Sequence, residues 1–542
     1  MAFGILEDHK LEQVPGTAFL HEQMDLPREF QEVPVELLKR ATGRLSHIIL
    51  VPQPSDSPND PLNWPLWKKD MILVIVGLSA AVVGAFGPML SPGFVVISED
   101  LGISINTLSQ ATAWLILTIG LSLFIANPLA KVWGKRPVYI VAIIIMLVCS
   151  IWGAVSKDYT SFLASRIVSG FGMAPYEVLV QCTIADLYFT HQRATRIAVW
   201  NLFLLSGISG GSLISGYIIE DIGWKWTFWI CAIMFGVFVI LVVFFVPETT
   251  YTRAPIRVRY ADMSLHPGSE KPALDVEHQE VSRTPQPTEL EQKHSYIRSL
   301  RVFNGRHTQT PFWKILVRPA VVFWYPAVLW AFLLYGVTLT WIVVFSVVNA
   351  AIFTLPPYNF SVSQTGLISL SPFIMTIVGE VIAGPLNDYL CVVFARKNHG
   401  IYEPEFRLLL MVPVTLIGVA GFFGFGATVH FQTHWSGPVL CFGLANMALA
   451  FANGCVFGYV IDSHESLAEE ALVAINARNF LTFGLTYFVN DWLARDGALN
   501  VFNVLGGTFI VVCGLTVPLW IFGKRIRSWI ARNAWLNDFM RG

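Results

Sequence analysis

Two charged residues, Arg166 and Glu177, stand inside an apolar stretch of the chain, residues 164–187. An unpaired charge in the interior of a membrane costs several kcal/mol, so a residue of this kind usually marks a functional site. In a helix, eleven residues make three turns plus about 20°, which places the two charges on one face about 16 Å apart. Because burial favours the protonated form of a carboxyl, Glu177 is a candidate for accepting and releasing a proton.

The same helical face carries Gly170, Met173 and Gln181. A membrane helix turns such a face away from lipid, toward other helices or a wet cavity. Arg166 falls in the outer third of the predicted helix, from which its long side chain could also reach the membrane surface. Glu177 lies too deep for that, so its carboxyl must be protonated, paired or hydrated.

A second isolated carboxylate, Glu380, is the only charged residue between Pro319 and Asn387. Two interpretations stay open. The side chain could bind protons or substrate together with Glu177, or it could pair with a residue of a neighbouring helix such as Arg478.

Polar and aromatic residues at helical spacing extend this pattern in the last third of the chain. They are Asn446 and Asn453, seven residues apart, and then Asn479, Phe483, Tyr487 and Asn490. Faces of this kind suit a cavity for an amphipathic solute, although each asparagine could instead bond to a neighbouring helix. Trp114, Trp330 and Trp341 could stack on a substrate, but packing or anchoring at the interface is the more common role of tryptophan in membrane proteins.

The composition is that of a polytopic membrane protein: 54% of the residues are hydrophobic and only 13% are charged, against roughly 25% charged in soluble domains. The net charge of −1 gives no reason to expect a nucleic-acid partner. The seven cysteines form no CxxC pair, so we expect neither disulfides nor a metal site. The sequence has no Gly-rich phosphate loop and no nucleophile elbow, which argues against an ATP-driven pump and an enzyme and leaves no cofactor to expect.

Apolar stretches long enough to cross a bilayer, about 20 residues each, predict the domain organisation. We expect a cytosolic N-terminal tail (1–68) without a cleaved signal peptide, a six-helix half (69–247), a mostly disordered linker (248–318), a second six-helix half (319–523) and an interfacial amphipathic tail (524–542). The twelve predicted helices lie near 71–93, 107–130, 137–156, 161–185, 197–219, 226–247, 320–350, 363–386, 407–427, 437–460, 471–492 and 499–522.

Basic residues in the short loops predict the orientation. Most fall on one side of the predicted bundle, and the other side has only Lys157, Lys225 and Arg495. Both termini and the linker are therefore expected in the cytosol. The one Asn-x-Ser/Thr sequence of the chain, at Asn359, falls in a loop on the opposite side, where it could be glycosylated.

A repeated segment follows the second helix of each half. The first copy reads Asn127-Pro128-Leu129-Ala130-Lys131 and continues with Gly134-Lys135-Arg136, and the second reads Gly384-Pro385-Leu386-Asn387-Asp388. Both resemble the Gly-x-x-x-Asp-x-x-Gly-Arg-Lys loop motif of the major facilitator superfamily. In the first copy Lys131 stands where that family has Asp, so the charge network of the motif must be rebuilt there, whereas Asp388 keeps the acid in the second.

Other segments match this family in the correct order between residues 60 and 523. They are Asp60-Pro61-Leu62-Asn63-Trp64-Pro65, Arg166-x-x-x-Gly170, the glycine series Gly207, Gly210, Gly211 and Gly216, Val246-Pro247-Glu248-Thr249, and Ala477-Arg478-Asn479-Phe480. They are similar to segments of fungal drug/proton antiporters, although Ser212 replaces the proline usual in the glycine series. Those glycines are expected to let helices pack closely.

The resemblance implies an all-α membrane protein of twelve helices whose two pseudo-symmetric halves rock about a central cavity. We expect a monomer in the plasma membrane that exports an organic small molecule in exchange for protons, with Glu177, Arg166 and Glu380 coupling the two movements. One alternative is proton-driven import of an organic cation such as a polyamine. Another, of a different class, is a nutrient sensor that does not transport.

Overall fold

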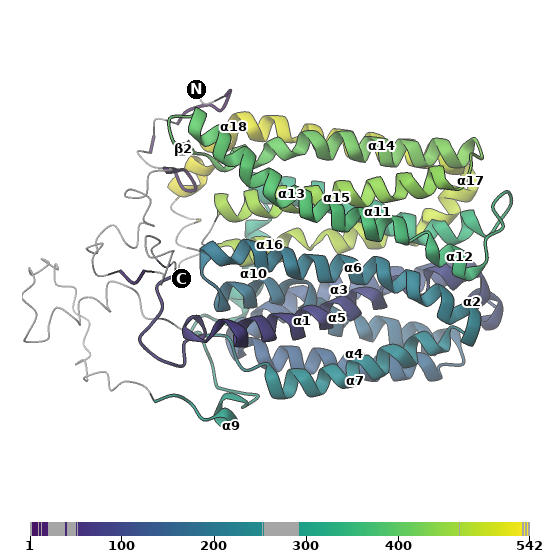
Figure 1. Cartoon of the computed structure of the whole chain (residues 1–542), viewed down its shortest axis with the longest axis horizontal. Coiled ribbons are helices and arrows are strands. Elements are labelled where there is room, and N and C mark those ends of the chain that lie inside the picture. The colour runs from purple at the N-terminus through teal and green to yellow at the C-terminus, as the bar shows by residue number, and fades with distance from the viewer. Residues whose placement is uncertain are drawn as a thin grey trace, which may run out of the picture.

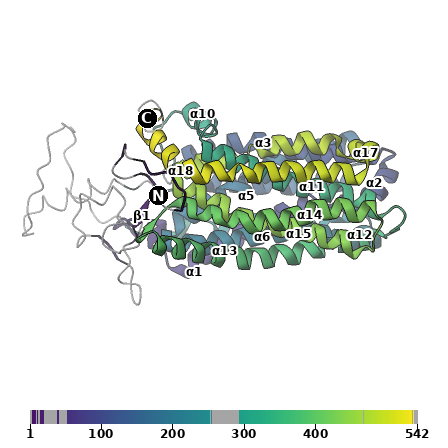
Figure 2. The same cartoon turned by 90° about the horizontal axis from the view of Figure 1, so that it is seen from above.

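Long helices make up most of the part of the chain that the computed structural model describes, which is residues 3–8, 10–11, 14–19, 38–40, 50, 52–251, 253, 292–464, 467–533, 536 and 539. Figure 1 shows them as one bundle of roughly parallel helices, with the early helices on one side and the late helices on the other. The backbone N–H of Leu6 donates to the carbonyl of Ile521, so residues near both termini meet at one end, which Figure 2 shows from above. We call this the terminal end and the other the distal end.

The first half contains six long helices. They are α1 (Leu66–Phe86), α3 (Ile105–Trp133), α4 (Lys135–Val155), α5 (Tyr159–Leu187), α6 (Thr190–Ile222) and α7 (Lys225–Phe245). After α1 the chain continues through a short turn, η5 (Ser91–Gly93), into α2 (Phe94–Leu101) at the distal end.

The second half repeats the pattern with more interruptions. Its long helices are α11 (Pro326–Phe353), α13 (Leu370–Lys397), α14 (Met411–His430), α15 (Ser436–Ser463), α17 (Arg478–Gly514) and α18 (Thr516–Arg532). The chain also has shorter elements. Before α1 lies η4 (Pro61–Asn63), and in or near the second half lie α9 (Tyr296–Ser299), α10 (Phe312–Val322), α12 (Val362–Leu367), η6 (Pro404–Leu410) and α16 (Ala468–Ile475).

Twelve crossings follow from the lengths of these helices. Eleven helical stretches of the described chain are long and apolar enough to span a membrane, and the last of them, Ala468–Arg532, has 65 residues. One crossing needs only about 20 residues. Gly497 interrupts this stretch with φ 77° and ψ 162°, outside the helical region, so the chain crosses once before and once after it. The two predicted spans near 471–492 and 499–522 thus correspond to two crossings, although residues 471–475 belong to α16 and the first crossing begins at Arg478.

Two further boundaries differ from the sequence-based expectation. The seventh span starts at Pro326 and not near 320, because α10 ends at Val322 and a turn separates the two helices. Residues 524–532 do not begin a separate interfacial helix but continue α18 to Arg532. Residues 254–291, the bulk of the linker predicted to be disordered, lie outside the described residues.

The N-terminal tail lies against the second half at the terminal end. β1 (Ala18–Phe19) pairs antiparallel with β2 (Ile401–Tyr402). Ile5 is fully buried and packs in one cluster with Phe406.

A clasp formed by Asn59 and Asp60 holds the described residues on both sides of the gap in the linker. Both oxygens of the buried Asp60 carboxylate accept hydrogen bonds from Arg253, at 2.8 and 3.1 Å. Asn59 donates to the carbonyl of Gln292 at 3.1 Å and accepts from the N–H of His294 at 2.8 Å. The clasp therefore holds Arg253 and residues 292–294, which flank residues 254–291 of the linker, next to each other and just before α1.

Candidate functional site

An ion pair between the two halves holds Glu177 of α5. The Nη2 of Arg478, the first residue of α17, lies 3.6 Å from Glu177 Oε2. The guanidinium also donates to Asn479 Oδ1 at 2.8 Å and lies 5.0 Å from the ring centre of Tyr335. Both charged side chains are largely buried, with 6% and 20% of their surface exposed. The apolar run of α5 thus puts its carboxylate opposite a cation of the other half.

A second carboxylate, Glu380 of α13, contacts both halves. Its Oε1 accepts a hydrogen bond of 2.6 Å from Asn201 Nδ2 on α6 and a longer one of 3.5 Å from Asn453 Nδ2 on α15. The suggested pair between Glu380 and Arg478 is wrong, because Arg478 faces Glu177. In the described part of the chain no basic side chain lies within 4 Å of Glu380.

The two contacts are reciprocal. Glu177 of the first half binds Arg478 of the second, and Glu380 of the second half binds Asn201 of the first. Glu177 and Asn201 each lie about ten residues from the terminal end of their helix, or about 15 Å at the rise of an α-helix, so the contacts belong to the interior of the bundle. An ionised carboxylate can only accept hydrogen bonds, whereas a protonated one also donates. A proton that binds to either group therefore changes a contact between the halves.

Several buried polar atoms in the described chain have no hydrogen-bond partner. They include Tyr176 Oη, Glu177 Oε2, Trp200 Nε1, Asn453 Oδ1, Asn479 Nδ2 and both side-chain heteroatoms of Asn490. Leaving such groups unpaired is costly, and native proteins usually supply water or a ligand to them. Asn453, Asn479 and Asn490 were all predicted to face a cavity, and their free atoms suit a polar solute.

The other predicted cavity residues divide into two groups. Phe483 lies 5.2 Å from Trp114 and 5.9 Å from Tyr487, centre to centre, and so forms an aromatic contact between α3 and α17. Asn446, by contrast, donates to the carbonyl of Phe442 in its own helix. Gln181 is half-buried.

Two of the candidate tryptophans have structural hydrogen bonds within the second half. Trp330 donates to Thr516 Oγ1 at 3.1 Å and Trp341 to the carbonyl of Leu505 at 2.9 Å, and both are buried. Trp114, which is 37% exposed, is therefore the one of the three candidate tryptophans that remains available to a substrate.

Arg166 does not reach the membrane surface, because only 1% of it is exposed. Its guanidinium donates to the carbonyls of Phe86 and Gly87 at 2.9 and 2.8 Å, and lies 4.9 Å from the ring centre of Phe86. These carbonyls belong to the last residue of α1 and the one after it. At that end of a helix the carbonyl groups have no N–H donor within the helix. The cation fits there because the carbonyl end of a helix carries partial negative charge. Arg166 thus joins α5 to α1 within the first half.

The repeated loop motif of the first half is built around Glu248. Its carboxylate accepts from the backbone N–H groups of Lys135 and Arg136, at 3.0 and 3.1 Å, and so caps the N-terminus of α4. Gly134 has φ 98°, and a Cβ there would overlap a carboxylate oxygen of Glu248. The side chain of Arg136 donates to the carbonyls of Val246, Val243 and Leu300. Glycine and the acidic residue are therefore both required at this turn.

Lys131 connects this motif to the second half. Its Nζ lies 2.7 Å from Glu470 and 3.0 Å from Glu469, both on α16. A lysine of one half and two glutamates of the other thus form a charge network at the position where the family's aspartate is missing. In the second copy Asp388 is 72% exposed and lies 3.9 Å from Arg407, which binds Asp462 more closely.

Two of the predicted packing glycines bring α6 close to α1. A Cβ at Gly207 would overlap the carbonyl oxygen of Ala81, and one at Gly211 would lie 2.6 Å from the Cβ of Ala85. No larger residue fits either position without separating the helices.

The other two face the second half. A Cβ at Gly216 would lie 2.9 Å from the Cα of Gly366 in α12, whereas one at Gly210 would make an ordinary contact of 3.6 Å with Phe373. Alternate faces of α6 thus serve packing within a half and contact between halves.

Sequence reasoning missed Asn201, Tyr335 and the two glutamates of α16 as partners. Asn201 had a signal, because it is the one amide side chain in the apolar run between Arg196 and Glu220. Tyr335 had none, since an isolated tyrosine in an apolar helix does not reveal the charge it faces.

The comparisons with known proteins agree with this architecture. The family model described as the Major Facilitator Superfamily matches residues 72–489. The chain belongs to this superfamily. An uncharacterised MFS-type transporter of Schizosaccharomyces pombe is 26% identical over 97% of this chain and 94% of its own length. The efflux pump radE of Floropilus chiversii is 25% identical over 87% of this chain and 84% of its own length.

A solved structure extends the likeness to three dimensions. The proton:xylose symporter XylE, a major facilitator protein, superposes with a TM-score of 0.58 over 84% of this chain and 96% of its own, at 14% identity. That likeness concerns the fold alone. Membership of the superfamily makes this chain a membrane transporter of small molecules and not an enzyme.

Proposed function

We propose that this major facilitator protein is a proton-coupled transporter that exports an organic small molecule from a fungal cell. The observation that carries the proposal is the pair of reciprocal contacts, Glu177 with Arg478 and Glu380 with Asn201, each joining the two halves. In this fold transport consists of the two halves rocking about a central site. A titratable group that holds the halves together converts proton binding into movement.

The mechanism begins at the carboxylates. Protonation of Glu177 removes its charge attraction for Arg478, and protonation of Glu380 turns its charge-assisted hydrogen bond with Asn201 into a weaker neutral one. Both changes weaken contacts between the halves and so shift the balance between the two open states. Release of the proton on the other side restores the contacts. The unpaired Oδ1 of Asn453, the unpaired Nδ2 of Asn479 and the aromatic contact around Phe483 provide polar and flat surfaces for the cargo.

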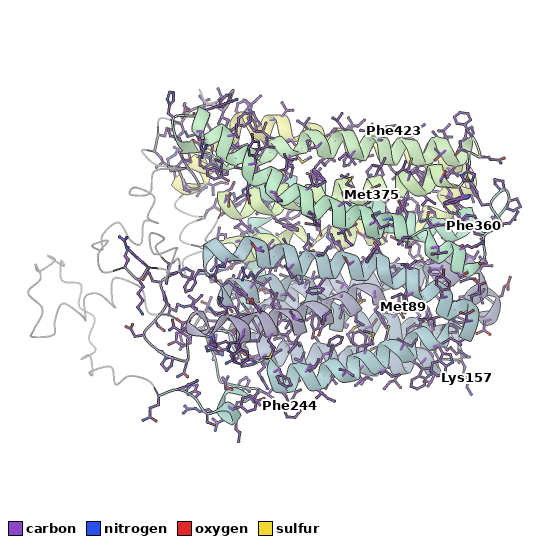
Figure 3. The ribbon with its side chains drawn as sticks, viewed as in Figure 1. Met89, Lys157, Phe244, Phe360, Met375 and Phe423 are labelled. Atoms are coloured by element: carbon purple, nitrogen blue, oxygen red, sulfur yellow. The ribbon has the colours of Figure 1, made fainter. Side chains whose placement is uncertain are left out.

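The direction of transport is supported by the name of one relative, the efflux pump radE. Orientation is supported by position: Lys157 and Phe360, labelled in Figure 3, lie at the distal end, and Asn359 is exposed beside Phe360. We place the distal end outside a plasma membrane, the terminal end in the cytosol, and a glycan on Asn359.

A flux assay in sealed proteoliposomes tests the coupling. Export of cargo in exchange for protons predicts that ethidium, used as the probe, accumulates on the proton-rich side of an imposed pH gradient. We expect Glu380→Gln and Glu177→Gln to abolish the effect of the gradient, while Glu99→Gln, an exposed residue of α2 at the distal end, retains it. Full proton-driven transport by both core variants would refute the coupling assignment.

A second candidate function is import of an organic cation, and one observation favours it. Glu380 is a half-buried carboxylate with no basic partner in the described chain, so a cationic substrate could provide one. Radiolabelled spermidine that accumulates on the side opposite the protons, and that Glu380→Gln no longer accumulates, would support import over export. A resistance and uptake screen with the gene deleted and overexpressed would then identify the substrate.

A further inference from the structure

A long apolar groove opens on the outer surface of the bundle at the terminal end, between the start of α11 and the end of α18. Its volume is about 570 Å³, within the range of ordinary ligand sites. Its lining includes none of the residues that form the contacts of Glu177, Glu380 or Lys131.

The groove extends along the membrane normal, parallel to α11 and α18. It runs from Trp324 and Trp529 near the surface to Leu333 and Leu515. Leu515 lies ten residues before Arg525, or about 15 Å at the helical rise, which is half the thickness of the apolar core of a bilayer. One acyl chain of one leaflet has this reach and direction.

The mouth of the groove carries a positive charge that the protein leaves available. Arg525 is exposed, and its Nε donates to the backbone carbonyl of Glu7. No carboxylate lies within ion-pair distance of Arg525 in the described chain, whereas its neighbours Lys524 and Arg527 are held by Glu403 and other carboxylates. Its remaining N–H groups are therefore free to bind a phosphate.

Tryptophans frame the same mouth. Trp324 is 73% exposed and Trp529 55% exposed. Tryptophan prefers the boundary between headgroups and acyl chains, so these two place the mouth of the groove at headgroup depth. The alternation of basic and apolar residues after residue 523 suggested an interfacial helix. These residues instead form the end of α18, which lies at headgroup depth.

We propose that the groove binds one anionic glycerophospholipid of the leaflet at the terminal end, with an acyl chain between α11 and α18 and its phosphate on Arg525. A basic pocket between membrane helices suits an anionic headgroup, and charge complementarity favours such a lipid over a neutral one. The lipid joins the first and last helices of the second half, and its binding does not depend on the direction or the coupling of transport.

Lipid retention by the purified full chain tests the proposal. Native mass spectrometry in detergent, with dioleoylphosphatidylserine or dioleoylphosphatidylcholine added, is expected to show one phosphatidylserine retained preferentially. Since one basic residue near a membrane surface contributes about 1 kcal/mol, Arg525→Gln should weaken this retention about fivefold. The matched control Arg396→Gln, which removes an exposed arginine of α13 at the same end, should leave retention unchanged.

Location is tested separately with a phosphatidylserine that carries a diazirine on its acyl chain. Cross-links are expected in peptides that contain residues 324–333 and 515–529 and are expected to decrease in Arg525→Gln. Equal retention of the two lipids, or cross-links elsewhere on the bundle, would overturn the proposal. Labelling of the groove by a photoactivatable sterol but not by the phospholipid would also overturn it and assign the groove to a sterol.

Discussion

Arg166 and Arg478, both buried, show how the same residue type serves different purposes. Arg166 binds backbone carbonyls that cannot move away from it, so it fixes α5 to α1. Arg478 binds a carboxylate whose charge depends on protonation, and that carboxylate belongs to the other half. The first arrangement suits stability and the second suits a switch.

Replacement of Arg166 by alanine is expected to destabilise the protein. The change leaves two buried carbonyls without donors and creates a cavity, for a combined loss of about 3 kcal/mol. Thermal unfolding in detergent should show a lower midpoint than for wild type and for the exposed control Arg396→Ala, while Arg166→Lys should recover part of the loss. If Arg166→Ala unfolds like wild type but loses proton coupling, Arg166 belongs to the transport site and not to the scaffold.

At the scale of elements, the capping of α4 by Glu248 predicts a difference between two glycines. Gly134 and Gly223 have similar positive φ angles, 98° and 95°, but only at Gly134 does a Cβ meet another group, the Glu248 carboxylate. Gly223→Ala measures the backbone strain alone. Gly134→Ala should cost that strain plus the cap, about 1 kcal/mol more. Equal shifts of the unfolding midpoint would show that the cap contributes nothing.

The clasp at Asp60 gives a prediction about pH. Burial alone would raise the pKa of Asp60, but its hydrogen bonds with Arg253, Ser55 and Leu62 hold that pKa below its ordinary value of 3.8. A lowered pKa means that the clasp has its full strength above pH 3.8 and loses it only as the pH falls through the lower folded value.

Limited proteolysis near Arg253 should therefore proceed at one rate from pH 7 down to pH 5. Asp60→Asn removes the charge at every pH and should accelerate cleavage severalfold already at pH 7, whereas Asp56→Asn, on an exposed neighbour, should not. Wild-type cleavage that accelerates between pH 7 and pH 5 would contradict a lowered pKa.

The elements were largely predictable from the sequence, because the bilayer requires apolar runs of a fixed length. Their partners were not. Glu177 and Glu380 are conspicuous in apolar helices, but hydropathy carries no information about which helix lies opposite. Arg478, suggested as the partner of Glu380, binds Glu177, and Glu380 binds Asn201. The absent acid at Lys131 suggested a network rebuilt within the first half, but the glutamates that Lys131 contacts belong to the second half, more than 300 residues away.

At the scale of the whole molecule, Lys131 and the two glutamates of α16 hold the halves together at the terminal end. The same end also has the described part of the N-terminal tail bound to the second half and the linker clasp beside the first. We therefore expect opening at the terminal end to require separation of the Lys131 network.

Charge reversal tests this network. Lys131→Glu places three carboxylates together and should favour the state open at the terminal end, whereas Lys131→Glu with Glu470→Lys should restore wild-type behaviour. Labelling of a single cysteine placed between the halves, in a cysteine-free background, measures the opening, and a double-mutant cycle isolates the coupling. Independent effects of the two substitutions would exclude a direct contact.

Because of the clasp at Asn59 and Asp60, the length of the linker segment between Arg253 and Gln292 does not depend on the distance between the halves. With Arg253, Gln292 and His294 anchored side by side, residues 254–291 start and finish at one place on the first half. Doubling the length of such a closed segment costs only about 0.6 kcal/mol in closure entropy. Related chains can lengthen or shorten this segment without affecting how the halves move, and an affinity tag or a fluorescent protein inserted there should leave transport intact.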